Sequence, residues 1–308
     1  MSKMVFVTGG SGFVGRAVID ELLARGHSIH ALVNRKDLPE AGERVKSFRG
    51  GLFDPAAIRA GMVGCDAVIH LVGIIMEQPG KGITFERIHF EGTKNIVNAA
   101  KEVGIQRYVQ MSALGTRADA VSQYHRTKWL AEEYLRASGL DWTIIRPSMI
   151  HGPSGDFMQM EAKWVRKQAA PFLFMPYFGR GLFGSGGAGM LQPVDVKDVA
   201  RAFVDALDKP GTIRQTYELG GSQQLTWPQM HQTAARLIAG KKRWIMPLPA
   251  WYAKAITFIT PAFLLPFNRD QVIMSQEENT CDLSKFITDF GWEPAGFDAS
   301  LAGYAGKL

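Results

Sequence analysis

Apolar residues along the first half of the chain follow two different spacings. Short continuous runs rich in Val and Ile are typical of buried strands, whereas apolar residues that recur at helical spacing are typical of helices packed on a sheet. The runs predict strands at 5–7, 28–33, 48–52, 67–72, 107–111 and 141–146. The helical spacing predicts helices at 14–23, from 55 onward, and at 85–103 and 124–137. This alternation predicts the α/β class, with a doubly wound parallel sheet.

Beyond Pro147 the alternation is less regular. The later predicted elements are a strand and helix within 192–208, a strand at 217–220 that returns to the sheet, and a helix at 227–238 capped by Thr226. We therefore expect a larger domain from 1–147 plus about 191–221, and a smaller one from 148–190 and 222–308. The smaller domain would cap the carboxyl ends of the strands. Six glycines between residues 179 and 189 predict a mobile lid or a crossing loop.

One long stretch, residues 244–267, carries a single charge at Lys254. Its four prolines argue against a continuous membrane-spanning helix. Two interpretations remain, a buried helix of the smaller domain or a hydrophobic surface that docks on a bilayer or a partner. We favour the buried helix, although the aromatic residues beside Lys241, Lys242 and Arg243 keep the surface interpretation open.

Glycines at positions 9, 12 and 15 separate the first predicted strand from the first helix. A dinucleotide-binding turn needs glycine for a sharp turn, for backbone contact with the pyrophosphate and for close packing of helix on strand. The phosphates would bind the free N–H groups at the start of the helix. The sequence therefore predicts a Rossmann-type fold with a nicotinamide dinucleotide bound at Thr8, Gly9, Gly10, Ser11, Gly12, Phe13, Val14 and Gly15.

The second predicted strand ends in Asn34, Arg35 and Lys36. NAD-selective folds usually place an acidic residue here, to bind the ribose 2′-hydroxyl. Two cations suit a 2′-phosphate instead, so we expect NADP(H) to be favoured over NAD(H). The alternative is that Arg35 and Lys36 are solvated loop charges.

Two further strand ends border the expected cofactor site. Asp54 follows the third predicted strand, where its carboxylate can bind an adenine amine, cap the helix that starts at Pro55, or do both. Leu71, Val72 and Gly73 end the fourth strand, and Gly73 lets the backbone pass close to a cofactor.

Tyr124 and Lys128 lie four residues apart on one predicted helix, so their side chains share a face. A lysine ammonium lowers the pKa of a nearby tyrosine, which makes the phenol a better acid–base group. Ser112 ends the fifth strand, where its hydroxyl can hold a substrate oxygen. We expect these three residues to be catalytic.

The composition limits the classes of partner. Of the 308 residues, 46% are hydrophobic and 21% are charged, which excludes a disordered chain. The net charge of +6 fits anionic ligands or an anionic membrane surface, but the scattered cations and the lack of a nucleic-acid motif argue against nucleic-acid binding. Two distant cysteines without metal-ligand spacing predict a reduced, cytoplasmic protein with no metal site. His70 and His151 are expected to be hydrogen-bonded core or cleft residues.

Residues 8–15, Tyr124 with Lys128, and Arg146-Pro147-Ser148 resemble the extended short-chain dehydrogenase/reductases over nearly the whole chain. Residues 89–95, the basic end of strand two, and Asp270-Gln271 with Glu278-Asn279 resemble an atypical branch. That branch includes the accessory NAD(P)H-binding subunit of respiratory complex I and its bacterial relatives. The resemblance implies bound NADP(H) or NAD(H), catalytic Ser112, Tyr124 and Lys128, and a cofactor site that includes Pro147 and Ser148.

Two positions depart from the pattern of active extended members. His89 stands where they usually carry Asn, so His89 would bind near the cofactor with a different proton relay. A single Ser112 replaces the usual pair of hydroxyl residues. Some members of the branch bind nucleotide without turnover.

Three functions therefore remain. The first is an NAD(P)-dependent oxidoreductase that acts on a small carbonyl or alcohol, which the aromatic residues at Trp164 and 172–178 suggest is apolar. The second is a non-catalytic NADP(H)-binding accessory or assembly module, peripheral to a respiratory membrane complex. The third and weakest is a nucleotide-sugar epimerase, which needs NAD.

Overall fold

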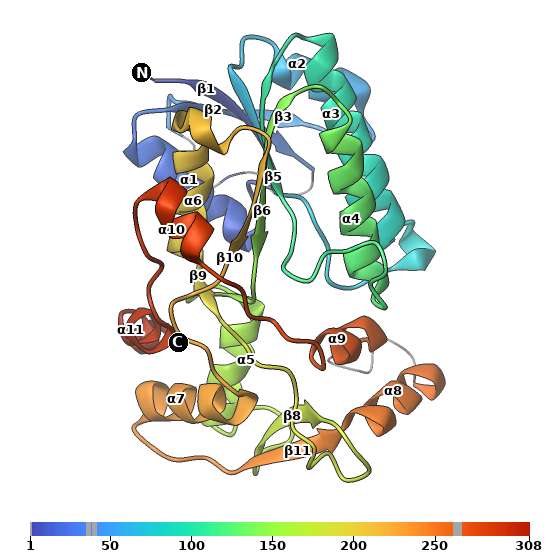
Figure 1. The fold of residues 1–308 in the computed structure, drawn as a ribbon, viewed down its shortest axis with the longest axis vertical. Helices are drawn as coiled ribbons and strands as arrows, with labels where there is room; N and C mark the ends of the chain where they lie inside the picture. Colours follow the sequence, from blue (N-terminus) through green and yellow to red (C-terminus); the bar gives the residue numbers. More distant parts are fainter. Residues whose placement is uncertain (1, 35–37, 39–41, 261–266) are drawn as a thin grey trace. The chain divides into compact units, whose positions relative to one another are not determined.

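A parallel sheet of seven strands forms the centre of the first of two structural units (Figure 1). The strands follow the order β10-β6-β5-β4-β1-β2-β3, and every neighbouring pair is parallel. The order reverses between β1 and β4, and doubly wound sheets bind ligands at the carboxyl ends of the strands beside such a reversal. The strands are β1 (Met4–Thr8), β2 (Ser28–Val33), β3 (Val45–Arg49), β4 (Ala67–His70), β5 (Arg107–Met111), β6 (Asp141–Pro147) and β10 (Gln215–Leu219).

Helices cover both faces of this sheet (Figure 1). On one face, α1 (Phe13–Ala24) packs against α6 (Val196–Asp208). The other face carries α2 (Pro55–Met62), α3 (Gly92–Glu102) and α4 (Gln123–Arg136). The fold is therefore the predicted Rossmann-type doubly wound sheet, and most predicted strands lie where the apolar runs indicate.

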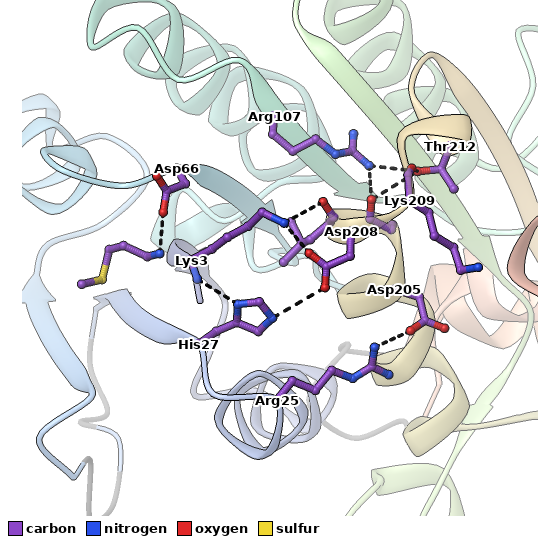
Figure 2. A network of polar contacts seen from close by, with 12 residues as sticks. Lys3, Arg25, His27, Asp66, Arg107, Asp205, Asp208, Lys209 and Thr212 are labelled. Carbon is purple, nitrogen blue, oxygen red and sulfur yellow. Dashed lines mark hydrogen bonds and ion pairs between the residues drawn. The ribbon is translucent and has the colours of Figure 1, made fainter. Parts of the chain in front are cut away.

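A network of polar contacts joins the start of β1 and the end of α1 to the end of α6 (Figure 2). Lys3 pairs with Asp208, and Arg25 pairs with Asp205. Deeper in the same unit, the Arg107 guanidinium donates hydrogen bonds to the Thr143 hydroxyl at 2.7 Å and to the Asp141 carbonyl at 2.6 Å. These contacts lie at the amino ends of the strands, so we regard them as structural.

The structure, a computed structural model, describes residues 2–34, 38, 42–260 and 267–308. The first unit comprises Met1–Pro147, Val196–Leu219 and Ser284–Trp292, and the second comprises Ser148–Asp195, Gly220–Leu283 and Glu293–Leu308. The segment 284–292, which we expected in the smaller domain, belongs to the first unit because α10 (Ser284–Phe290) packs on β10. There Phe290 meets the Tyr217 ring edge-on, with 5.0 Å between centroids.

Two small parallel ladders and several helices build the second unit. β7 (Ile150–His151) pairs with β9 (Val194–Asp195), and β8 (Met175–Gly179) pairs with β11 (Ile245–Pro249). The predicted cap of α7 is confirmed, because the Thr226 hydroxyl accepts from the Gln229 N–H at 3.3 Å. The helices of this unit are α5 (Asp156–Val165), α7 (Trp227–Ala239), α8 (Ala250–Ile259), α9 (Arg269–Met274) and α11 (Phe297–Ala302).

Two predicted elements differ from the structure. The third strand was expected at 48–52 but is Val45–Arg49, because β3 is an edge strand with exposed polar residues such as Lys46. Leu52 is buried in the following turn, where its carbonyl accepts from the Asn95 amide at 2.9 Å. The helix expected at 85–103 begins as a wider π-helical turn, Glu86–Glu91, before α3.

The glycines between 179 and 189 allow close backbone packing within the second unit. A Cβ at Gly179 would lie 1.9 Å from the Gly184 carbonyl oxygen, and a Cβ at Gly189 would lie 1.8 Å from that of Glu277. The mobile lid stays a prediction, since the packing alone requires glycine at these two positions.

The favoured interpretation of residues 244–267 as a buried helix is wrong for the part that is described. This part forms β11 and α8, and among the first eight residues of α8 only Ala250 and Ala253 are buried, while Trp251 and Tyr252 are exposed. Trp244 and Trp251 are exposed, and residues 261–266 lie outside the described residues. Among the described helices, none combines the length and the apolar character needed to cross a bilayer.

Candidate nucleotide and active site

The loop between β1 and α1 is packed too tightly for any residue but glycine at two positions. Gly9 has φ +78°, a left-handed conformation, and a Cβ there would lie 3.1 Å from the backbone of Leu71 and Val72. A Cβ at Gly15 would lie 2.1 Å from the Gly9 carbonyl oxygen. The loop therefore packs directly on the residues that follow β4, and the first turn of α1 packs against the loop.

The amino end of α1 is left open for an anion. Gly12 is the N-cap residue of α1, and no side chain caps the helix by a hydrogen bond there. The first turn of α1 carries no acidic residue. The first N–H groups of a helix have no partner within the helix and carry a partial positive charge. This end fits a pyrophosphate, with backbone N–H groups from Phe13 and Val14 as donors.

A buried hydrogen bond fixes the start of this loop. The Thr8 hydroxyl lies 2.5 Å from Nδ1 of His70, and both side chains are buried. Burial, with the nearby charge of Lys128, lowers the pKa of His70 to about 3, so its imidazole is neutral. This confirms the expectation that His70 is hydrogen-bonded, and it shows that His70 supports the loop.

The end of β2 is described only in part. Asn34 is exposed and faces the turn at Gly51, whose Cβ would lie 3.7 Å from the Asn34 amide. The predicted residues Arg35 and Lys36 lie outside the described residues. Asp54 caps α2, with its carboxylate accepting from the Ala57 N–H at 3.0 Å. Its contact with adenine stays a prediction.

Lys128 is buried at the carboxyl end of the sheet. Its ammonium donates to the Met111 carbonyl at 3.3 Å, and a Cβ at Gly73 would lie 3.0 Å from its Nζ. Burial lowers the pKa of Lys128 to about 8, although the charge of Glu132 raises it. The ends of β4 and β5 thus meet at this lysine.

Glu132, one turn after Lys128 on α4, is fully buried in an ion cluster. Its carboxylate accepts from Arg146 at 2.9 and 2.7 Å and from Arg136 at 2.7 Å. The sequence analysis missed Glu132 as a partner of the site. The signal was its i, i+4 spacing from Lys128.

Tyr124 is half-buried and surrounded by rings. It meets His89 edge-on with 5.2 Å between centroids, and it meets Phe85 edge-on at 5.8 Å. Burial raises the pKa of Tyr124 to about 12, opposite to the lowering that we expected from Lys128. Removal of the phenolate from water is the cause, because burial disfavours the charged form of the side chain.

His89 is held between the loop after β4 and helix α4. Its Nε2 accepts from the Ile74 N–H at 3.1 Å, and its Nδ1 lies 2.9 Å from the Thr127 hydroxyl. Burial is the main cause that keeps the pKa of His89 well below its usual value, with Lys128 adding to it. A neutral imidazole therefore packs against the Tyr124 ring.

The remaining predicted residues lie in different places. Ser112 is buried, and its hydroxyl donates to that of Thr116 at 3.3 Å, a partner that the sequence did not indicate. Pro147 ends β6, and its carbonyl accepts from the Leu114 N–H at 2.9 Å. Ser148 belongs to the second unit, where its hydroxyl donates to the Gln192 carbonyl. Within the described residues, no group of His, Cys, Asp and Glu side chains could hold a metal ion.

Comparison with known proteins agrees with this geometry. Residues 9–163 match the family model described as NAD(P)H-binding. Because the match covers half of the chain, the protein belongs to this NAD(P)H-binding family. Its fold is that of the short-chain dehydrogenase/reductases and epimerases, and its cofactor is a nicotinamide dinucleotide.

Three similar proteins show the range of this group. A mitochondrial NADH dehydrogenase [ubiquinone] 1 alpha subcomplex subunit 9 from Arabidopsis thaliana is 28% identical, over 92% of this chain and 70% of its own. Cinnamoyl-CoA reductase 1 from Oryza sativa is 28% identical, over 68% of both chains. The structure of a short-chain dehydrogenase/reductase superfamily protein from Agrobacterium tumefaciens with bound NAD has a TM-score of 0.70 at 20% identity, covering 98% of this chain and 95% of that one.

Proposed function

We propose that the protein is an NAD(P)H-dependent oxidoreductase that reduces a small carbonyl compound. The observation that carries this proposal is the position of Lys128. Its buried ammonium donates a hydrogen bond to the Met111 carbonyl and lies close to Gly73. The two residues before Gly73, Leu71 and Val72, pack against Gly9 of the glycine loop. Lys128 therefore shares one edge of the sheet with the nucleotide loop, and it lies on the same helix as Tyr124.

The nicotinamide, when bound, supplies the hydride. Tyr124 acts as the general acid, which donates its phenolic proton to the oxygen of the substrate carbonyl. Lys128 returns a proton and stabilises the phenolate as it forms, and Ser112 orients the carbonyl oxygen. Burial raises the pKa of Tyr124, so the phenol is protonated at neutral pH, as a general acid for carbonyl reduction must be.

Replacement of Tyr124 tests this assignment. Tyr124→Phe keeps the ring contacts and removes the proton donor, so turnover with a panel of carbonyl compounds should fall by about 10²–10⁴-fold. NADPH affinity, measured by fluorescence titration, should change little. Tyr134→Phe on the same helix is the matched control, since its hydroxyl contacts only Asn98 among the described residues. Unchanged turnover in Tyr124→Phe would reject the assignment.

We further propose that NADP(H) is the preferred cofactor, with Arg35 and Lys36 binding its 2′-phosphate. Titration of both reduced cofactors should give NADPH at least about tenfold tighter binding, a difference of about 1.4 kcal/mol. Arg35→Ala should remove most of that preference, while Arg44→Ala, an exposed cation on the same connection, should retain it. Tighter binding of NADH would contradict the proposal and would favour the third candidate function, a nucleotide-sugar epimerase.

A second candidate function is a non-catalytic NADP(H)-binding module that is cytoplasmic and peripheral to a respiratory membrane complex. The similarity of nearly the whole chain to the Arabidopsis subunit supports it. This function predicts tightly retained nucleotide, identified by mass spectrometry of the native protein, together with no turnover of any carbonyl compound. Turnover that depends on Tyr124 would exclude it.

A further inference from the structure

Large hydrophobic side chains are exposed together on one part of the second unit. Of the twelve exposed large hydrophobic residues in the described chain, eight lie around the β8–β11 ladder. Trp244 is 72% exposed and Phe183 is 76% exposed. We call this surface the β8–β11 face, and its eight residues are Phe172, Leu173, Leu182, Phe183, Trp244, Met246, Trp251 and Tyr252.

The parallel pairing of β8 and β11 brings these residues together. At the amino end of the ladder, the Met175 N–H donates to the Trp244 carbonyl at 2.7 Å, and residues 172–173 lie two to three residues along the chain from this contact. At the other end, the Trp251 indole N–H donates to the Leu182 carbonyl at 2.9 Å. Figure 1 shows β8, β11 and α8 adjoining one another.

The two chain segments that form this face carry charge of one sign, while Asp270 of α9, which packs on α8, and Glu277, whose backbone meets Gly189, lie on neighbouring segments. Residues 163–194 and 219–269, which contain both strands and their flanking segments, carry ten Lys and Arg and no Asp or Glu. Since the whole chain has a net charge of +6, the remaining residues carry a net charge of −4. Lys241 and Lys242 are exposed immediately before Trp244. Aromatic side chains next to cations are typical of proteins that bind an anionic membrane surface.

We propose that the β8–β11 face docks the protein on the surface of an anionic phospholipid bilayer. Trp244, Phe183 and their neighbours enter the interfacial region, and Lys241 and Lys242 bind the headgroup phosphates. A lipid surface fits better than a protein partner because the flanking segments lack the carboxylates that a mixed-charge protein interface uses. All of these residues belong to the second unit, while Tyr124 and the glycine loop belong to the first. Docking therefore does not depend on whether the protein is catalytic.

Co-sedimentation of the full chain with lipid vesicles tests the proposal. The protein should bind vesicles of phosphatidylcholine with phosphatidylglycerol, and it should bind vesicles of phosphatidylcholine alone much more weakly. Lys241→Ser with Lys242→Ser should weaken binding to the anionic vesicles by about twentyfold. Trp244→Ser should weaken it by about tenfold. Trp244→Phe should retain binding and lower the quenching of tryptophan fluorescence by brominated lipid.

Matched controls separate docking from general charge and from loss of folding. Lys101→Ser with Lys307→Ser removes two exposed cations outside the face, and Val63→Ser removes an exposed apolar residue from the first unit. Both control variants should bind vesicles like the unchanged protein, and every variant should retain NADPH affinity. Equal weakening in the controls, or no binding to anionic vesicles, would overturn the proposal. Binding only to native membranes that carry proteins would also overturn it and would assign the face to a protein partner.

Discussion

At the scale of single residues, Gly15 sets the tightest distance in the candidate site. The position that its Cβ would occupy lies 2.1 Å from a backbone oxygen and 2.7 Å from the Cα of Gly10. Backbone atoms cannot rotate away as a side chain can, so a methyl group there must displace the whole loop.

Gly15→Ala should therefore reduce both stability and nucleotide binding. We expect a loss of about 1–3 kcal/mol in the free energy of unfolding, measured by urea denaturation. NADPH affinity should fall by tenfold or more, because the phosphate-binding N–H groups move with the loop. Gly211→Ala is the control, since a Cβ there meets nothing within 4 Å. Similar values for the two variants would show that the loop tolerates the methyl group.

The same scale shows which site residues can be predicted from sequence. The glycines and the pair Tyr124 and Lys128 were predictable because the spacing that matters lies within a few residues of the chain. The bond between Thr8 and His70 was not, since it joins two strands 62 residues apart. The raised pKa of Tyr124 also required the structure, because burial by Phe85 and His89 depends on packing that local spacing does not encode.

At the scale of elements, buried elements were easier to predict than exposed ones. β5 was predicted with its observed bounds because apolar residues dominate a strand that is covered on both sides. The predicted position of β3 was three residues too late. An edge strand alternates exposed polar and partly buried residues, and the prediction relied on the apolar residues Phe48 and Leu52 instead. The π-helical turn had no recognisable signal, although it carries His89 against Tyr124. Such turns are frequent at functional sites.

At the scale of the whole molecule, buried neutral histidines link stability to pH. Burial lowers the pKa of His70 in the first unit to about 3 and that of His151 in the second unit to about 4. Each unfolded histidine has a pKa near 6.5. Between these values the unfolded chain binds more protons than the folded chain, so stability falls as the pH falls below about 6.5.

We expect each of these two histidines to cost about 2 kcal/mol of stability at pH 5 relative to pH 7. Urea denaturation at both pH values measures the difference. His151→Gln should reduce the difference in unfolding free energy between pH 7 and pH 5 by about 2 kcal/mol, whatever its effect on stability at pH 7. His30→Gln is the control, since His30 is only half-buried, with its ring 4.8 Å from that of Phe48 between centroids. A pH dependence that His151→Gln leaves unchanged would contradict this account.

The interleaving of the two units has a consequence for protein synthesis. The chain alternates between the units in six segments, so the first unit receives β10 only after residue 215 and α10 only after residue 284. A ribosome releases the chain from its amino terminus, and domains generally fold as units while they emerge. The nucleotide-binding unit is therefore completed only when nearly all of the chain has been translated. By then the β8–β11 face has already left the ribosome, so its exposed tryptophans meet the cell before α10 can pack on β10.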